Sequence, residues 1–174
     1  MVCKLSLVNI IEMTTNFQLE NYLKNEKGFL GAFPSDKLPE NPKSGSSLIV
    51  NYSKYGEKGS HWVSMRGLNS VNTEYFDSYG FNADDDDLLL GETTHFKNYL
   101  EKNSINGKYT VNMLNLQQLT SDVCGEYSAW FIKWGLPELF YNGKVIVNPR
   151  WKPYIKNNNS FMNDKLIKKS VGIR

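Results

Sequence analysis

The chain has few of the residues that cross-link a fold or bind a transition metal. Its 174 residues include two cysteines, Cys3 and Cys124, and two histidines, His61 and His95. Two thiols cannot build the disulfide framework of a small secreted protein, and a reducing compartment is the setting we expect. The four residues also lack the paired spacing of a zinc site. We therefore expect neither a disulfide scaffold nor a metal centre.

Long apolar runs and targeting patterns are missing as well. No apolar stretch approaches the roughly 20 residues that span a bilayer, and the first residues lack the pattern of a signal peptide. Hydrophobic residues make up 40% of the chain, which is enough for one domain with a buried core, whereas the length is too short for two. We expect a single domain over residues 1–174 that does not contact a membrane.

The order of predicted elements is typical of an α+β fold. Thr15 to Gln18 has the form of a capping box and predicts a helix that runs to about Lys24. The segment from Gly28 to Ser46 is rich in proline, glycine and serine and predicts a long surface loop. Apolar patterns predict strands over 47–52, 61–66, 73–80 and 109–114, and helices over 88–100 and from position 124 onward.

The stretch around Cys124 is the most informative part of the chain. Bulky apolar residues at 127, 130, 131 and 134 recur at helical spacing, which predicts a helix that begins near Cys124 with Ser121 or Asp122 as its cap. In the first turn of a helix, free N–H groups and the helix dipole favour an anion. A thiol held there loses its proton more readily, and the thiolate is the nucleophile. Cys124 is thus a candidate nucleophile.

A nucleophilic thiol needs a base and a group that orients the base. His61 begins one predicted strand and Asp77 lies in the next, and the turn-rich segment 67–72 between them predicts an antiparallel hairpin. If the turn centres near Asn69, position 65 faces 73, 63 faces 75, and His61 faces Asp77 with Cβ atoms about 5 Å apart. The carboxylate would then bind one imidazole nitrogen and leave the other for the thiol. A one-residue slip would separate the pair onto opposite faces.

Two other features have simpler explanations. His95 falls in the predicted helix 88–100, where nothing nearby resembles a catalytic partner, so we expect a surface histidine. The acidic run Asp84–Asp87 precedes the same helix, and acidic residues suit a helix N-terminus better than they indicate a metal site.

The catalytic residue types also occur in a familiar order. His61, Asp77, a glutamine and Cys124 follow one another, with Trp62 directly after the histidine and Gly125 directly after the cysteine. This order resembles the adenain-like and ubiquitin-like-protease clan of cysteine proteases, and the resemblance runs from about position 28 to 134. The segment 33–39 is similar to one common in proteases of virophages and virus-like DNA transposons. Adenovirus enzymes carry Glu at the position of Asp77, whereas many other members carry Asp.

The resemblance implies a papain-like α+β fold in the rearranged His-Asp-Gln-Cys order, with a central mixed sheet flanked by helices. It implies that Cys124 attacks the scissile carbonyl, that His61 transfers the proton, and that Asp77 orients the imidazole. A glutamine amide would donate to the oxyanion. Most members place this glutamine six residues before the cysteine, which favours Gln118, whereas adenovirus enzymes place it seven before, which leaves Gln117 as the alternative.

The resemblance also suggests a substrate. It implies an endopeptidase that cleaves viral capsid or core precursors at glycine-containing sites during virion maturation, in the cytoplasm or nucleus of the host cell and in the virion. Trp62 would roof a narrow cleft beside the nucleophile, and Gly125 would line the substrate site. One alternative is a protease that removes SUMO- or ubiquitin-like modifiers. Another is an inactive module that keeps the protease fold for binding.

Basic residues gather near the C-terminal end. The segment 151–174 has a net charge of +5, while the whole chain has +2. Trp151, Tyr154 and Phe161 lie among these cations, a pattern that fits nucleic-acid contact. A solvated surface that packs its aromatic residues on the body is the simpler explanation. The adenovirus relative uses DNA as a cofactor, which adds weight to the first explanation.

No cofactor is needed for the chemistry itself, but DNA and a peptide activator are candidate regulators. In the adenovirus enzyme the peptide attaches through a disulfide, and no cysteine here occupies a comparable later position. We expect the protein to be a monomer that binds a capsid precursor as its substrate.

Overall fold

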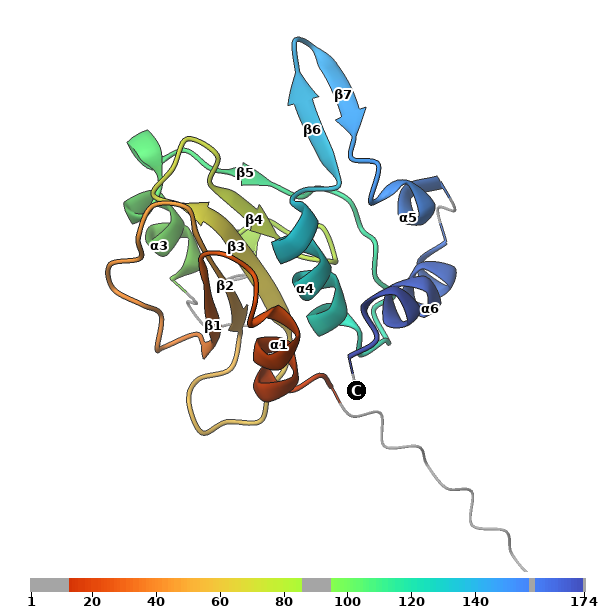
Figure 1. Cartoon of the computed structure of the whole chain (residues 1–174), viewed down its shortest axis with the longest axis horizontal. Coiled ribbons are helices and arrows are strands. Elements are labelled where there is room, and N and C mark those ends of the chain that lie inside the picture. Colours follow the sequence, from red (N-terminus) through yellow and green to blue (C-terminus); the bar gives the residue numbers. More distant parts are fainter. Residues whose placement is uncertain (1–12, 86–94, 157–158, 174) are drawn as a thin grey trace, which may run out of the picture.

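The computed structural model describes residues 13–85, 95–156 and 159–173. Figure 1 shows the elements in chain order. They are α1 (Asn16–Leu23), β1 (Phe29–Pro34), β2 (Ser46–Asn51), β3 (Trp62–Leu68), β4 (Glu74–Phe76), α3 (Phe96–Lys102), the 3₁₀ turn η1 (Ile105–Gly107), β5 (Thr110–Val111), α4 (Cys124–Trp134), β6 (Glu138–Tyr141), β7 (Lys144–Val147), α5 (Lys152–Lys156) and α6 (Ser160–Val171).

A five-stranded mixed sheet with the order β1-β2-β3-β4-β5 forms the centre of the fold. The two outer pairs, β1 with β2 and β4 with β5, are parallel, and the two inner pairs are antiparallel. Every residue of β2 is buried, which requires that both faces of the sheet are covered. The predicted α+β class is therefore confirmed, with a mixed sheet and helices.

Alternate residues of β2 pack into two different cores. Ile49 belongs to a cluster with residues of α1, α4 and α6, whereas Leu48 and Val50 belong to a cluster with Phe96 and Leu100 of α3. Because neighbouring residues of a strand point to opposite faces, α1 and α4 cover one face and α3 covers the other. Figure 1 shows α4 lying across β3 on the face that it shares with α1.

The predicted first helix is confirmed. Thr15 is the N-cap of α1, and its side chain and that of Gln18 form the reciprocal bonds of a capping box. The predicted loop from 28 to 46 is wrong in its first part, because β1 occupies Phe29–Pro34 and pairs in parallel with β2. Its sequence, Phe-Leu-Gly-Ala-Phe-Pro, contains a glycine and a proline, and it forms an edge strand, where such residues are tolerated.

The helix predicted over 88–100 is described only from His95 onward, because residues 86–94 lie outside the described parts of the chain. His95 is exposed and adopts a left-handed conformation with φ 58° as the N-cap of α3. The helix therefore begins at Phe96, and His95 is not inside it as predicted. Two of its residues, Phe96 and Leu100, are buried one turn apart, as an amphipathic helix requires.

The hairpin of β3 and β4 has a different register from the predicted one. Met65 pairs with Tyr75, and Ser64 pairs with Phe76, so each partner lies two residues further along the chain than predicted. The turn therefore centres on Ser70, whose N–H donates to Gly67 O. Since side chains alternate with a period of two, a two-residue change keeps His61 and Asp77 on the same face.

Two predicted strands are shorter than expected because hydrogen bonds just beyond their ends turn the backbone away. Strand β4 ends at Phe76, and the chain turns through Gly80, whose N–H donates to Asp77 O (3.0 Å). Strand β5 ends at Val111 because the side-chain amide of Asn112 donates to Asp77 O (2.7 Å) and Leu114 O (2.9 Å). Both turns place functional residues just beyond the strands.

The C-terminal segment packs onto the body. Trp151 is fully buried, contacts the rings of Phe76 and Tyr127, and donates from Nε1 to Gly135 O (2.9 Å). Ile167 and Val171 of α6 also belong to the core that contains α4. Among residues 13–85, 95–156 and 159–173, no helix is long and apolar enough to cross a membrane.

Strands β6 and β7 form a separate hairpin that projects from the body (Figure 1). Its turn is the Asn142-Gly143 pair, in which both residues have positive φ, as a tight two-residue turn requires. No hairpin was predicted over these residues, although an Asn-Gly pair between two apolar runs is a strong hairpin signal.

Candidate active site

His61 and Asp77 meet at the ends of two paired strands. His61 directly precedes β3 and Asp77 directly follows β4. His61 Nε2 lies 3.1 Å from Asp77 Oδ1. The Asp77 side chain has no exposed surface, and His61 is 8% exposed. If the β3–β4 register is extended beyond β4, the residue directly opposite His61 is Tyr79. His61 and Asp77 therefore meet diagonally across the hairpin.

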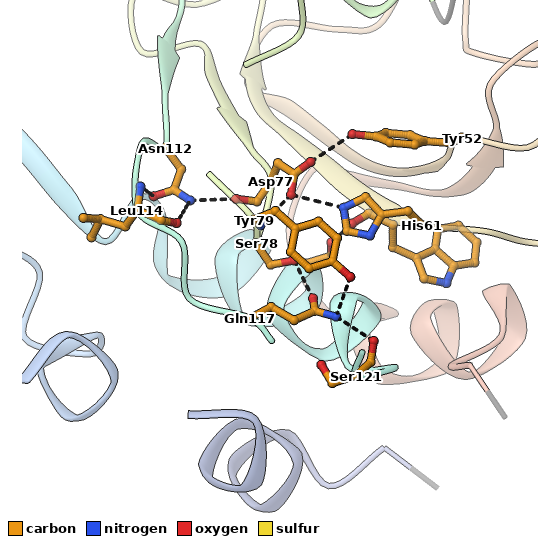
Figure 2. A network of polar contacts seen from close by, with 11 residues as sticks. Tyr52, His61, Asp77, Ser78, Tyr79, Asn112, Leu114, Gln117 and Ser121 are labelled. Atoms are coloured by element: carbon orange, nitrogen blue, oxygen red, sulfur yellow. Dashed lines mark hydrogen bonds and ion pairs between the residues drawn. The ribbon is translucent and has the colours of Figure 1, made fainter. Parts of the chain in front are cut away.

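Asp77 is held by two donors in addition to His61. Tyr52 Oη donates to Asp77 Oδ2 (2.9 Å), and the backbone N–H of Tyr79 donates to Oδ1 (2.6 Å). Figure 2 shows these contacts meeting at the carboxylate, with Asn112 bound to the backbone carbonyl behind it. A carboxylate fixed in this way holds the imidazole in one orientation. Tyr52 comes from the end of β2, and no motif in the sequence connects it with Asp77.

Cys124 is the first residue of α4, as the sequence predicts. The predicted caps are wrong: the N-cap is Val123, which makes no side-chain cap bond. Ser121 Oγ instead donates to Gln118 O (3.0 Å), and Asp122 lies 3.7 Å from Lys168 Nζ. The side chains of both predicted caps are thus used elsewhere, and none of them covers the N–H groups of the first turn.

Cys124 contributes to the raised pKa of His61. Since His61 Nε2 faces Asp77, the nitrogen that remains for the thiol is Nδ1. Burial by itself lowers the pKa of His61, but the negative charge and hydrogen bond of Asp77, followed by the hydrogen bond and charge of Cys124, raise this pKa to about 10. The site therefore favours an imidazolium at His61.

The two candidate glutamines have different environments. Gln117 is 1% exposed, and its Oε1 accepts from Ser78 Oγ (2.6 Å) while its Nε2 donates to Ser121 O (3.0 Å) and Tyr79 Oη (3.3 Å). Figure 2 shows the Gln117 amide lying between Ser78, Tyr79 and Ser121. The Gln118 side chain is half-buried and makes no hydrogen bond within the described parts of the chain. Gln117 is therefore the glutamine that the polar network of Asp77 includes.

Helix α6 supports the glutamine turn from behind. Asp164 Oδ2 accepts from the backbone N–H of Gln118 (3.2 Å), and Oδ1 accepts from Tyr127 Oη (3.2 Å). Tyr127 Oη also contacts Leu116 O (3.0 Å). Burial raises the pKa of Asp164 above its usual value. Its hydrogen bonds to Ser121, Gln118 and Tyr127 offset only part of this rise. The sequence offers no signal for this role, because Asp164 lies 46 residues after the turn that it supports.

Trp62 and Gly125 lie against the segment that precedes α1. Trp62 is 7% exposed, and its Nε1 donates to Thr14 O (2.8 Å). A Cβ atom on Gly125 would lie only 2.8 Å from Thr14 Cβ, so a side chain there would displace this segment. Thr14 Oγ1 in turn donates to the buried Glu126 carboxylate (2.8 Å). Gly125 thus has a packing role, and its role in substrate binding stays a prediction.

A cleft of about 780 Å³ extends from Trp62 over α1 and the ends of β1 and β2. Its walls come from the segment before α1, from β1 and from the loop that joins β2 to β3. The lining residues are Met13, Thr14, Thr15, Asn16, Ala32, Phe33, Pro34, Asn51, Ser53, Lys54, Tyr55, Gly56, Glu57, Lys58, Gly59 and Trp62. The cleft reaches Trp62, but His61, Asp77, Gln117 and Cys124 are not among its lining residues.

The remaining candidates lie elsewhere. His95 is the N-cap of α3, which packs on the sheet face opposite α4, so it does not join the His61 network. Asp84 is exposed and pairs with Lys97 Nζ (3.0 Å). No group of three or more His, Cys, Asp or Glu side chains within residues 13–85, 95–156 and 159–173 is arranged to hold a metal ion. Cys3 lies outside the described residues.

Comparison with known proteins gives little further information. No protein-family model matches the chain, and no curated protein matches it. Among solved structures, the crystal structure of selenomethionine ASFV pS273R protease is similar, with 17% sequence identity and a TM-score of 0.40 over 72% of this chain. The match covers 58% of that chain.

The raised pKa of His61 predicts how stability changes with pH. An ordinary histidine titrates near pH 6.5, and the pKa of folded His61 is raised to about 10. The folded state binds this proton more tightly, so the stabilisation is fully present below about pH 6.5 and is lost as pH rises through about 10. Asp77→Asn removes the charge that raises the pKa and should flatten this decline in the free energy of unfolding.

Urea denaturation between pH 6 and 10 measures both slopes. Asp84→Asn is the matched control, because it removes an exposed carboxylate outside the site and should keep the wild-type slope. Equal slopes for wild type and Asp77→Asn would contradict the assignment of the His61 pKa to Asp77.

Proposed function

We propose that the protein is a cysteine endopeptidase with a papain-like fold in the rearranged His-Asp-Gln-Cys order. The observation that carries the proposal is the contact of His61 Nε2 with Oδ1 of the fully buried Asp77 (3.1 Å), together with the placement of Cys124 at the first position of α4. A nucleophile, a base and an orienting carboxylate in this relation are the recognised requirements for acyl transfer through a thioester.

In the proposed reaction, Cys124 Sγ attacks the scissile carbonyl as a thiolate. The imidazolium of His61 gives its Nδ1 proton to the leaving amine, and the acyl group stays on sulfur as a thioester. His61 then takes a proton from water as the water oxygen attacks the thioester carbonyl. The C–S bond breaks, Cys124 leaves as the thiolate beside the His61 imidazolium, and the acid product is released. Asp77 does not exchange a proton; it orients the imidazole and stabilises the imidazolium.

The tetrahedral intermediate of each step carries a negative oxygen, which needs preorganised donors. The backbone N–H groups at the start of α4 are suitable, since the N-cap residue Val123 makes no side-chain bond to them. We predicted Gln118 as the side-chain donor, with Gln117 as the alternative. The buried network around Gln117 favours the alternative, because Ser78 and Ser121 fix the orientation of its amide.

The substrate that we propose is a viral capsid or core precursor cut next to glycine, in the infected host cell or the virion. The resemblance to maturation proteases suggests this class of substrate. Only 2% of Cys124 is exposed, which favours a substrate with small residues beside the scissile bond. Removal of a SUMO- or ubiquitin-like modifier would use the same site and is the second candidate.

Cleavage assays with two substrates test the proposed function. The protein should cut a capsid precursor at glycine-containing sites, which mass spectrometry of the products can locate, and Cys124→Ala should abolish cutting while it keeps the fold. A SUMO-like precursor is the comparison substrate, and preferential cutting of it would transfer the assignment to the second candidate. Equal rates for Cys124→Ala and wild type on either substrate would contradict the whole proposal.

Substitution of each glutamine distinguishes the two candidate donors. Loss of an oxyanion donor costs on the order of a hundred- to a thousand-fold in turnover. We expect this loss for Gln117→Ala and a much smaller effect for Gln118→Ala, measured as kcat on one peptide substrate. Because the two positions are adjacent, each variant serves as the control for the other. A larger loss for Gln118→Ala would restore our first choice.

We also propose that the cations of α6 bind nucleic acid, with DNA as a candidate activator. Lys165, Lys168 and Lys169 are exposed on α6, and Phe161 is exposed beside Lys165. Because the same helix carries the buried Asp164, deletion of the segment would disturb the site. Substitution of surface lysines is therefore the suitable test.

The triple variant Lys165→Gln, Lys168→Gln, Lys169→Gln should bind DNA more weakly than wild type. If these lysines neutralise phosphates, the slope of log affinity against log salt should become shallower by about 0.9 for each phosphate that the variant no longer neutralises. The control triple variant Lys43→Gln, Lys108→Gln, Lys144→Gln removes equal charge from exposed positions elsewhere. Equal effects of the two triple variants would show that overall charge, and not α6, determines binding.

A further inference from the structure

Tyr79 contacts both the candidate base and the carboxylate that orients it, and the proposed function does not yet use this residue. Its ring stacks on the imidazole of His61, with ring centroids 4.7 Å apart and an interplanar angle of 19°. Its backbone N–H donates to Asp77 Oδ1 (2.6 Å). The position of the phenol is therefore fixed by the two residues that the proposed chemistry requires.

The hydroxyl group of Tyr79 lies beside the amide of Gln117. Ser121 O can only accept a hydrogen bond, so its contact with Nε2 (3.0 Å) fixes which end of the amide carries the N–H groups. The second N–H of Nε2 is then directed to Tyr79 Oη, at 3.3 Å. This distance is at the long end for an N–H···O bond. A stronger acceptor can therefore replace the hydroxyl oxygen as the partner of this N–H with little loss of free energy.

The proton of the Tyr79 hydroxyl is available for donation. Tyr79 Oη accepts from Gln117, and within the described parts of the chain no acceptor takes its own proton. Burial first, and then the negative charges of Cys124 and Asp77, raise the pKa of Tyr79 to about 12. The phenol therefore keeps its proton at neutral pH.

We infer that the Tyr79 hydroxyl is a second side-chain donor of the oxyanion site. When an oxyanion forms on the adduct of Cys124, it takes the second N–H of Gln117 and accepts the O–H of Tyr79 at the same time. No proton is transferred in this contact, and Tyr79 Oη exchanges its role as an acceptor for a role as a donor. The inference rests on the proposed function, and it adds a catalytic residue to the proposed site.

The variant Tyr79→Phe isolates the hydroxyl, because it keeps the ring stacked on His61. A good oxyanion donor contributes on the order of a hundred- to a thousand-fold to turnover, and Tyr79 is half-exposed, so we expect kcat to fall by about ten- to a hundred-fold. KM should change little, because a donor that acts on the oxyanion contributes mainly in the transition state.

Two reactions at Cys124 separate this role from a structural one. A glycine-containing peptide aldehyde adds to the thiol and forms an oxyanion, so Tyr79→Phe should weaken its binding. Iodoacetamide alkylates the same thiol by displacement without an oxyanion, so its rate should stay at the wild-type value. Tyr79→Leu removes the stacking as well and should slow alkylation, because His61 loses the ring that fixes it.

Tyr99→Phe is the matched control, because it also removes one tyrosine hydroxyl, which donates to Pro39 O (2.9 Å) outside the site. This variant should match wild type in every assay. Unchanged kcat and aldehyde affinity in Tyr79→Phe, or an equal loss of alkylation and turnover, would overturn the inference. If Gln117→Ala slows turnover and Tyr79→Phe does not, only the role of Tyr79 is wrong. If neither the aldehyde nor the peptide reacts at Cys124 in wild type, the proposed function itself is wrong.

Discussion

The buried contact between Asp77 and His61 is the interaction on which the rest of the site depends. Removal of a carboxylate from water is costly unless hydrogen bonds and an opposite charge compensate for it. Asp77 has no exposed surface, and Tyr52, His61 and the backbone N–H of Tyr79 supply this compensation. The three partners come from the end of β2, the start of β3 and the turn after β4. The carboxylate thus connects the central strands of the sheet and sets the charge of the imidazole that faces Cys124.

The second constraint is the turn that carries the glutamines. Ser78, the neighbour of Asp77, donates to the Gln117 side chain, so the base and the proposed oxyanion donor belong to one hydrogen-bonded network (Figure 2). Asp164 of α6 binds the backbone of the next residue, Gln118. The C-terminal segment, which is notable in the sequence for its positive charge, therefore also has a structural role at the site. Substitution of its exposed lysines should affect nucleic-acid binding, whereas substitution of the buried Asp164 should disturb the turn that carries the glutamines.

Much of the candidate site could be predicted from short patterns. The apolar spacing after Cys124 predicts where α4 begins, because a helix that buries one face must repeat its apolar residues every three or four positions. The hairpin between His61 and Asp77 follows from two apolar runs around a turn-rich segment. Its register was wrong by two residues, yet the pair still meets, since the side-chain period of a strand is two. The caps of α4 could not be predicted, because Ser121 and Asp122 bind groups that lie elsewhere in the fold.

The sequence by itself determined the α+β class, the helix that presents Cys124, and the face shared by His61 and Asp77, because each depends on local periodicity or on a single hairpin. Only the tertiary structure decided that β1 is an edge strand, that Gln117 rather than Gln118 enters the network of Asp77, and that Tyr52, Tyr79 and Asp164 surround the site. These features depend on pairings between segments that are distant in the chain, and their geometry arises when the sheet and helices pack. No local pattern encodes which buried oxygen a tyrosine or an amide will bind.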